Sequence, residues 1–158
     1  MKMKAAVLRR FDAEQPFADS KPISIEEVTL DPPGPNEVLV RIGGAGLCHS
    51  DLSVMNGARP RPEPLVLGHE GAGSIVEVGS AITDIAPGDH IVFQFSPSCG
   101  RCRRCMEGRP QVCEAGAKAK AAGDLMSGGR RIVDADGNRI CLLYTSPSPR
   151  DLSTSRMP

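Results

Sequence analysis

The sequence of 158 residues contains no tryptophan and a single tyrosine, and aromatic residues make up only 3% of it. Its core must therefore be built from aliphatic side chains. A net charge is also missing, because 19 Lys and Arg residues balance 19 Asp and Glu residues. Such a balance gives no indication of nucleic acid or an anionic membrane as a partner.

Long apolar segments are missing as well. No run approaches the about 20 residues that span a bilayer. The first residues, MKMKAAVLRRFD, lack the apolar stretch of a signal peptide. We therefore expect a cytoplasmic protein without a membrane partner. In a reducing compartment, clustered cysteines more often bind metal than form disulfides.

The length indicates one domain, and its pattern is mainly β. Strands are expected at residues 3–9, 23–30, 37–42, 73–79 and 89–95, and turns rich in Pro and Gly separate several of them. Short strands with regular turns favour a small barrel or sandwich. Gly43, Gly44 and Gly46 interrupt the third strand and predict a bulge or a close backbone approach. A short helix is expected at residues 49–57, and a flexible loop at residues 116–131.

The last residues, CLLYTSPSPRDLSTSRMP (141–158), have no hydrophobic period and are rich in Ser, Pro and Arg. One interpretation is a disordered tail. The same letters can also be encoded by the mosaic end and adapter of transposon-based sequencing libraries. We therefore predict a natural domain at residues 1–140, followed by a non-native read-through tail at 141–158 that is excluded from fold reasoning.

Four of the six cysteines fall within fifteen residues, with the spacing Cys-x₂-Cys-x₂-Cys-x₇-Cys: Cys99, Cys102, Cys105 and Cys113. A bacterial ferredoxin run would continue Cys-x₃-Cys-Pro, which this segment does not. Disulfides between cysteines three apart are sterically poor. The spacing predicts a tetrahedral zinc site in a lobe at residues 97–115. A site with four cysteine ligands has no open position, so its role would be structural.

A second constellation lies in GLCHSD (46–51) and GHEGAG (68–73). Cys48 and His69 are ligand types that suit Zn²⁺. A catalytic zinc needs three protein ligands and an open position, so this pair alone is weak evidence. A lone cysteine is more often a small buried apolar residue.

Four segments in one order carry a family resemblance: GAGLCHSD, LGHEGAGSIVEVGS, APGDHIVF and the four-cysteine run. Together they resemble the N-terminal half of a zinc-dependent alcohol dehydrogenase of the medium-chain dehydrogenase/reductase superfamily. The resemblance covers residues 4–140. It implies a GroES-like, partly open β-barrel from which the zinc lobe projects.

The resemblance also implies roles for individual residues around two zinc ions. Cys48 and His69 match the first two ligands of the catalytic zinc, and Glu70 matches the carboxylate beside that zinc. Asp51 matches the acid that orients the ligands. The four clustered cysteines match the ligands of the structural zinc.

Two further positions match groups that handle the proton and the cofactor. Ser50 matches the hydroxyl that takes the substrate proton, and His49 matches a contact to the cofactor pyrophosphate. Without the resemblance, Ser50 and Asp51 would be interpreted as helix-capping residues. Some members have a relay histidine where this chain has Ser53.

The resemblance implies more than this chain contains. The third catalytic zinc ligand, a cysteine, and the Rossmann domain that binds NAD or NADP both lie beyond residue 140 in the family. A full-length member would oxidise a small alcohol to an aldehyde or ketone and is expected to be a homo-oligomer. The 158-residue chain alone is predicted to be inactive.

Other functions stay open at this point. One is a zinc-stabilised GroES-like binding module without dehydrogenase activity. Others are a polyol dehydrogenase and a thiol-linked formaldehyde dehydrogenase of the same superfamily. A zinc-free quinone reductase is disfavoured by Cys48 and by the cysteine lobe. The sequence does not name the alcohol.

Overall fold

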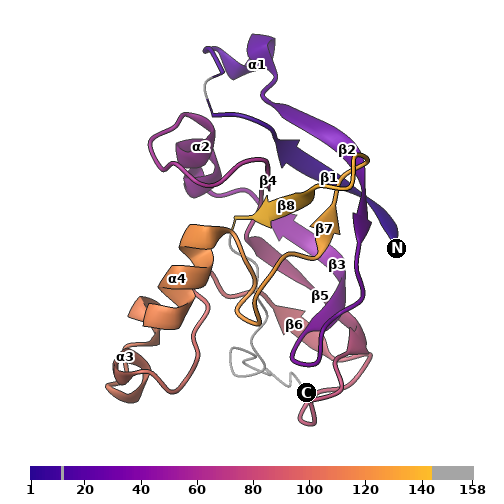
Figure 1. Ribbon diagram of the computed structural model, residues 1–158, viewed down its shortest axis with the longest axis vertical. Coiled ribbons are helices and arrows are strands. Elements are labelled where there is room, and N and C mark those ends of the chain that lie inside the picture. Colours follow the sequence, from indigo (N-terminus) through magenta and orange to yellow (C-terminus); the bar gives the residue numbers. More distant parts are fainter. Residues whose placement is uncertain (12, 144–158) are drawn as a thin grey trace.

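The computed structural model describes residues 1–11 and 13–143, and its strands form two sheets (Figure 1). The strands are short, as their turn-rich sequence predicts. They are β1 (Lys2–Leu8), β2 (Ile23–Leu30), β3 (Val38–Gly46), β4 (Leu65–Val66), β5 (Glu70–Val78), β6 (His90–Val92), β7 (Ile132–Val133) and β8 (Arg139–Leu142). The helices are α1 (Phe17–Ser20), α2 (His49–Met55), α3 (Arg103–Met106) and α4 (Glu114–Ala122), with a 3₁₀ turn at Pro110–Val112.

Five strands close into a ring in the order β1-β2-β7-β8-β4, and β3, β5 and β6 form a separate antiparallel sheet. Within the ring only β4 and β8 run parallel. The mainly β architecture with a small barrel that the sequence predicts is confirmed. The sequence pattern did not indicate that the strands divide between a small closed ring and a second sheet.

Strand β1 separates two apolar clusters. Successive side chains of a strand point to opposite faces, so Val7 and Leu8 belong to different clusters although both are fully buried. Val7 packs with Val28 of β2, whereas Leu8 packs with Leu65 of β4 and Val54 of α2. The cluster around Leu8 therefore attaches α2 to the ring, and α2 carries the candidate site.

The glycines of β3 produce the predicted bulge. The pairing of β3 with β5 shifts between Ile42 and Gly44, which leaves Gly43 without a register partner. On β5, a Cβ at Gly73 would lie 2.2 Å from the carbonyl oxygen of Arg41, so only glycine allows this backbone approach. Beyond the bulge the sheet stays paired down to Gly46, the last residue of β3.

The flexible loop predicted at residues 116–131 is wrong in its first part, which belongs to α4. The segment is rich in alanine and lysine, two strong helix formers. Its N-cap is Cys113, whose sulfur accepts the Gly116 N–H, and its C-cap is Gly123 in the left-handed region at φ 70°. The capped alanine-lysine run decides the conformation, although Gly116 lies within the helix.

Strand β8 continues past the predicted domain boundary at residue 140. Cys141 and Leu143 are each 1% exposed and lie in the cluster around Leu8. Burial does not reveal which codons encode these residues, so the origin of the tail stays a prediction. Residues 144–158 of the predicted tail lie outside the described residues. No helix in the described part of the chain is long and apolar enough to cross a membrane.

Candidate metal centres and active site

The first turn of α2 fixes the position of Cys48. This residue is the N-cap, in an extended conformation at φ −105° and ψ 151°. Its sulfur accepts the Asp51 backbone N–H, and Asp51 Oδ2 in turn accepts the Cys48 N–H at 3.1 Å. This reciprocal pattern is a capping box with a cysteine in the place of the usual hydroxyl residue. The predicted capping role of Asp51 is therefore real, and it also orients the Cys48 thiol.

The carboxylate of Asp51 connects this turn to the segment that carries His69. Asp51 Oδ1 accepts the Gly68 N–H at 3.0 Å and lies 3.5 Å from His69 Nδ1. Gly68 has φ +101°, a conformation that glycine adopts readily. Asp51 is only 6% exposed. One buried carboxylate thus holds both candidate ligand segments in register.

The imidazole of His69 is 2% exposed, and its two nitrogens face different groups. Nδ1 faces the Asp51 carboxylate, which favours a proton on Nδ1 and a lone pair on Nε2. Nε2 lies 3.1 Å from Ser50 Oγ, which is also buried. This arrangement suits the tautomer in which His69 would ligate a metal through Nε2.

Three potential ligand atoms converge at this point. The Cys48 sulfur, a His69 ring nitrogen and a Glu70 carboxylate oxygen all lie within 4.8 Å of one another. Thiolate, imidazole and carboxylate are all groups that bind Zn²⁺, so the donor set fits that ion. Gly46 is the cross-strand partner of Glu70, and a Cβ on Gly46 would lie 2.3 Å from Glu70 Oε2. The missing side chain of Gly46 therefore leaves the space that the carboxylate occupies.

His49 stands apart from this group. It is the first residue of α2 and is exposed to solvent. Its Nδ1 lies 3.5 Å from Ser53 Oγ, and Ser53 Oγ also donates to the His49 carbonyl at 3.1 Å. An exposed imidazole at a helix start suits contact with a molecule outside the domain, but its predicted role toward the cofactor stays a prediction.

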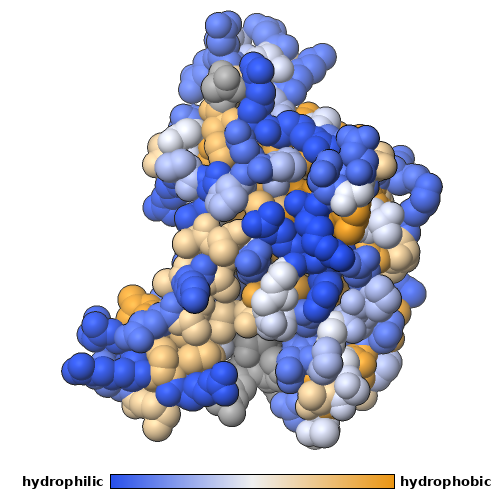
Figure 2. Space-filling model, in the orientation of Figure 1, coloured by the Kyte–Doolittle hydropathy of each residue, from blue (hydrophilic) through white to orange (hydrophobic). Residues whose placement is uncertain are grey.

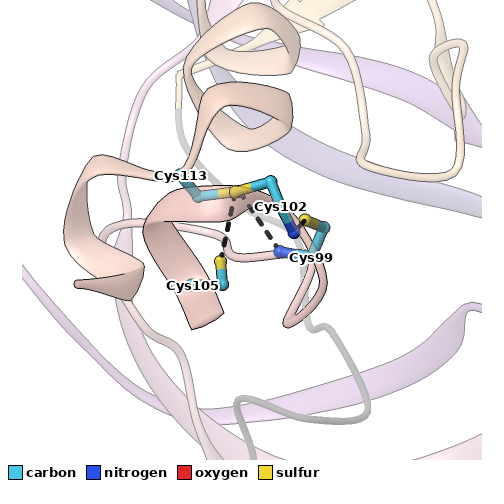
Figure 3. A group of neighbouring side chains, drawn as sticks. All are labelled: Cys99, Cys102, Cys105 and Cys113. Carbon is cyan, nitrogen blue, oxygen red and sulfur yellow. Dashed lines mark hydrogen bonds between the residues drawn. The ribbon is translucent and has the colours of Figure 1, made fainter. Parts of the chain in front are cut away.

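The four clustered cysteines converge in the projecting lobe (Figure 3). Their sulfur atoms all lie within 4.8 Å of one another, and Cys102 Sγ is 3.6 Å from Cys105 Sγ and 3.8 Å from Cys113 Sγ. Four thiolates at the zinc–sulfur bond length of about 2.3 Å in a tetrahedron lie about 3.8 Å apart. A disulfide would need about 2.05 Å, and all six cysteines of the chain are free. The geometry fits a tetrahedral Zn²⁺.

The thiols of the lobe differ in pKa, because backbone amides and desolvation act on them unequally. Hydrogen bonding from the backbone of Cys105 and Glu114 lowers the pKa of Cys102 to about 6. Desolvation raises the pKa of Cys105 to about 11. Amide hydrogen bonds stabilise the thiolate form, which is the form that ligates metal. The lobe therefore offers at least one thiolate near neutral pH and must lose protons to offer four.

Comparison with known families agrees with this geometry. Residues 34–136 match the family described as "Alcohol dehydrogenase GroES-like domain". The chain belongs to this family. The match includes the α2 turn, the His69 segment, the zinc lobe and α4.

Individual relatives share the same family character. A Mycobacterium tuberculosis protein that bears the name alcohol dehydrogenase D is 50% identical over 117 residues, which cover 74% of this chain and 30% of the relative. S-(hydroxymethyl)glutathione dehydrogenase of Escherichia coli is 38% identical over 132 residues, covering 83% of this chain and 34% of the relative. This chain therefore spans about a third of the length of these proteins.

A solved structure extends the comparison to three dimensions. The alcohol dehydrogenase zinc-binding domain protein from Burkholderia ambifaria has a TM-score of 0.78 and 35% identity, covering 91% of this chain and 36% of that chain. At this identity and coverage the likeness supports both the fold and the membership of a zinc-dependent alcohol dehydrogenase family.

Sequence reasoning missed one residue that borders the candidate site. The ring of Phe95 lies edge-on to His69, with 5.0 Å between ring centres and 64° between ring planes. Phe95 is 41% exposed, so it offers an apolar wall beside the ligand atoms. Its position four residues before Cys99 in a sequence with only four phenylalanines was the available signal.

Proposed function

We propose that the full-length protein is a zinc-dependent alcohol dehydrogenase that oxidises an alcohol to an aldehyde or ketone with NAD or NADP. The observation that carries this proposal is the convergence of Cys48, His69 and Glu70 within 4.8 Å, with the Ser50 hydroxyl beside them. Family membership and the names of the relatives support it.

The chain's residues would hold and orient a reacting alcohol. When bound, zinc lowers the pKa of a ligated hydroxyl and the nicotinamide accepts hydride. Cys48 and His69 would hold the metal, and Glu70 would adjust the ligand set from the open side. Ser50 Oγ would accept the proton of the substrate hydroxyl and pass its own proton on. Phe95 would exclude water from one side of the site.

Asp51 would act through the ligands and not on the substrate. Its carboxylate accepts the Cys48 N–H and lies 3.5 Å from His69 Nδ1, where it would favour the ligating tautomer, as partners of metal-bound histidines commonly do. His49 would meet the pyrophosphate of the cofactor at the start of α2. The four cysteines of the lobe would hold a second, structural zinc with no open position.

Several finer statements belong to the same proposal. Residues 1–140 would derive from the natural gene and residues 141–158 from adapter read-through, which the source nucleotide record can check. The third zinc ligand and the cofactor domain would be supplied by the rest of the protein, so the chain alone would not turn over alcohol. The full-length protein would be a cytoplasmic homo-oligomer.

The decisive experiment uses the recovered full-length gene. Purified enzyme should reduce NAD or NADP in the presence of a simple alcohol such as benzyl alcohol. Ser50→Ala should lower kcat by about 10²-fold, which is the low end of the contribution of a positioned proton-transfer group. Ser24→Ala removes an exposed hydroxyl on β2 and is the matched control. A zinc-loaded full-length protein without alcohol-dependent reduction of either cofactor would contradict the proposal.

A further inference from the structure

A lysine stands over the aromatic wall of the candidate site. Lys120 Nζ lies 5.4 Å from the ring centre of Phe95, within the range of a cation–π contact. The same ring lies 5.0 Å from the ring of His69. The distance from the Lys120 ammonium to the centre of the His69 ring therefore cannot exceed the sum of these two distances. No role for Lys120 follows from the dehydrogenase chemistry described above.

The lobe holds Lys120 and Phe95 in this arrangement. The Cys113 sulfur accepts the Gly116 N–H at 3.3 Å at the start of α4, and it accepts the Cys99 N–H at the same distance. A Cβ on Gly116 would lie 2.0 Å from the Pro97 carbonyl oxygen, so α4 begins directly against the segment that follows Phe95. In Figure 2 the lobe and α4 project from the body of the protein, and their surface carries both hydrophilic and hydrophobic residues.

The charge of Lys120 is opposite to that of the acidic groups at the candidate site, which are Cys48, Asp51 and Glu70. Lys120 places a cation over the face of the Phe95 ring, beside these groups. An alcohol whose hydroxyl reaches His69 could lay an apolar segment along Phe95 and present an anion to the ammonium. Opposite charges at such a distance favour one substrate over an uncharged analogue.

We propose that Lys120 is a specificity-determining residue that favours alcohols bearing a carboxylate on the far side of a ring-sized apolar spacer. This inference rests on the proposed function, because it assigns the substrate class of the same site. Lys118 lies on the same helix and is exposed. Among the described residues it makes no cation–π contact with Phe95, so it is the matched control for Lys120.

The test compares 4-(hydroxymethyl)benzoate with benzyl alcohol. Ligand-detected NMR titrations on the zinc-saturated 158-residue chain measure both dissociation constants. We expect the carboxylated alcohol to bind about two- to fivefold more tightly, the range of a partly exposed ion pair. Lys120→Met should remove this difference, Lys120→Arg should retain it, and Lys118→Met should retain it.

The inference would be overturned if neither compound bound. It would also be overturned if the preference for the carboxylated alcohol survived Lys120→Met, or if Lys118→Met removed it equally. The same two compounds are then assayed as substrates of the full-length enzyme. A Lys120-dependent binding preference without turnover would support the inference and reject the oxidoreductase. Turnover without any preference for the carboxylated alcohol would support the oxidoreductase and reject the role of Lys120.

Discussion

Replacing Asp51 by asparagine tests the central contact of the candidate site. The carboxylate accepts the backbone N–H of Cys48 at 3.1 Å and of Gly68 at 3.0 Å, and it lies 3.5 Å from His69 Nδ1. Asparagine keeps the shape but offers one oxygen and one NH₂ group. One of the two backbone N–H groups would therefore face another donor, and the imidazole would lose its anionic partner.

The magnitude follows from these contacts. Hydrogen bonds to charged groups contribute about 1.5–3 kcal/mol, and a buried donor left without an acceptor costs about 1–3 kcal/mol. Because the two effects overlap in one substitution, we expect Asp51→Asn to lower the free energy of unfolding by about 2–4 kcal/mol. Loss of the partner of a ligating histidine typically weakens metal affinity by about 10- to 100-fold. We expect that loss at the site formed by Cys48, His69 and Glu70.

Two measurements separate these effects. Guanidinium unfolding followed by far-UV circular dichroism gives stability, since the chain has no tryptophan. Co²⁺ titration followed by thiolate absorption gives metal affinity, with the four-cysteine lobe as an internal reference. Asp89→Asn is the control, because Asp89 Oδ2 accepts the Ala86 N–H at 2.9 Å in an exposed turn. Its expected change is below about 0.5 kcal/mol. If Asp51→Asn matched this control in both measurements, the reasoning would be refuted.

Three other substitutions or conditions give separate outcomes. Gly46→Ala places a Cβ 2.3 Å from Glu70 Oε2, so Co²⁺ affinity at the candidate catalytic site should fall by about tenfold as the carboxylate moves. Gly44→Ala is the control and should change this affinity little, because nothing lies within 4 Å of its Cβ. Equal effects of the two substitutions would reject the argument. Cys105→Ser should remove one zinc equivalent from the loaded chain, as counted by native mass spectrometry, and an unchanged zinc count would reject the tetrahedral lobe. Zinc affinity of the lobe should rise between pH 6 and pH 8, because Cys105, with a pKa of about 11, must release a proton on binding throughout this range, and Cys102, with a pKa of about 6, is only about half ionised at pH 6. Calorimetry in two buffers of different ionisation enthalpy would show the proton release, and its absence would count against the assignment.

The lobe could be predicted from the sequence because its signal is local. The four cysteines span fifteen residues, so their spacing alone brings them onto one loop. The strands were predicted for the same reason, since alternation and turn residues act within a few positions. Helix α4 was missed although its alanine-lysine run favours a helix. Its N-cap is Cys113, a residue that the sequence assigned to the lobe alone.

The candidate active site depends on contacts that no local pattern encodes. Asp51 was expected to cap a helix or to orient ligands. The structure shows that its carboxylate accepts the N–H of Cys48 and that of Gly68 across the fold, and its role toward a metal stays a prediction. His69 precedes β5 and Phe95 follows β6, so their contact depends on the pairing of these two strands. Such contacts follow from tertiary packing, so the family resemblance was the only basis on which some of them could be predicted.

The bulge in β3 shows how a non-local site can still depend on a local signal. Ile42 pairs with Gly73, and Gly44, Ala45 and Gly46 pair with residues 72, 71 and 70 because the bulge takes up Gly43. If the same residues paired without a bulge, Ala45 would lie opposite Glu70. A one-residue slip also exchanges the faces of a strand. The bulge therefore sets glycine, rather than alanine, against Glu70, at the position where a Cβ would displace its carboxylate.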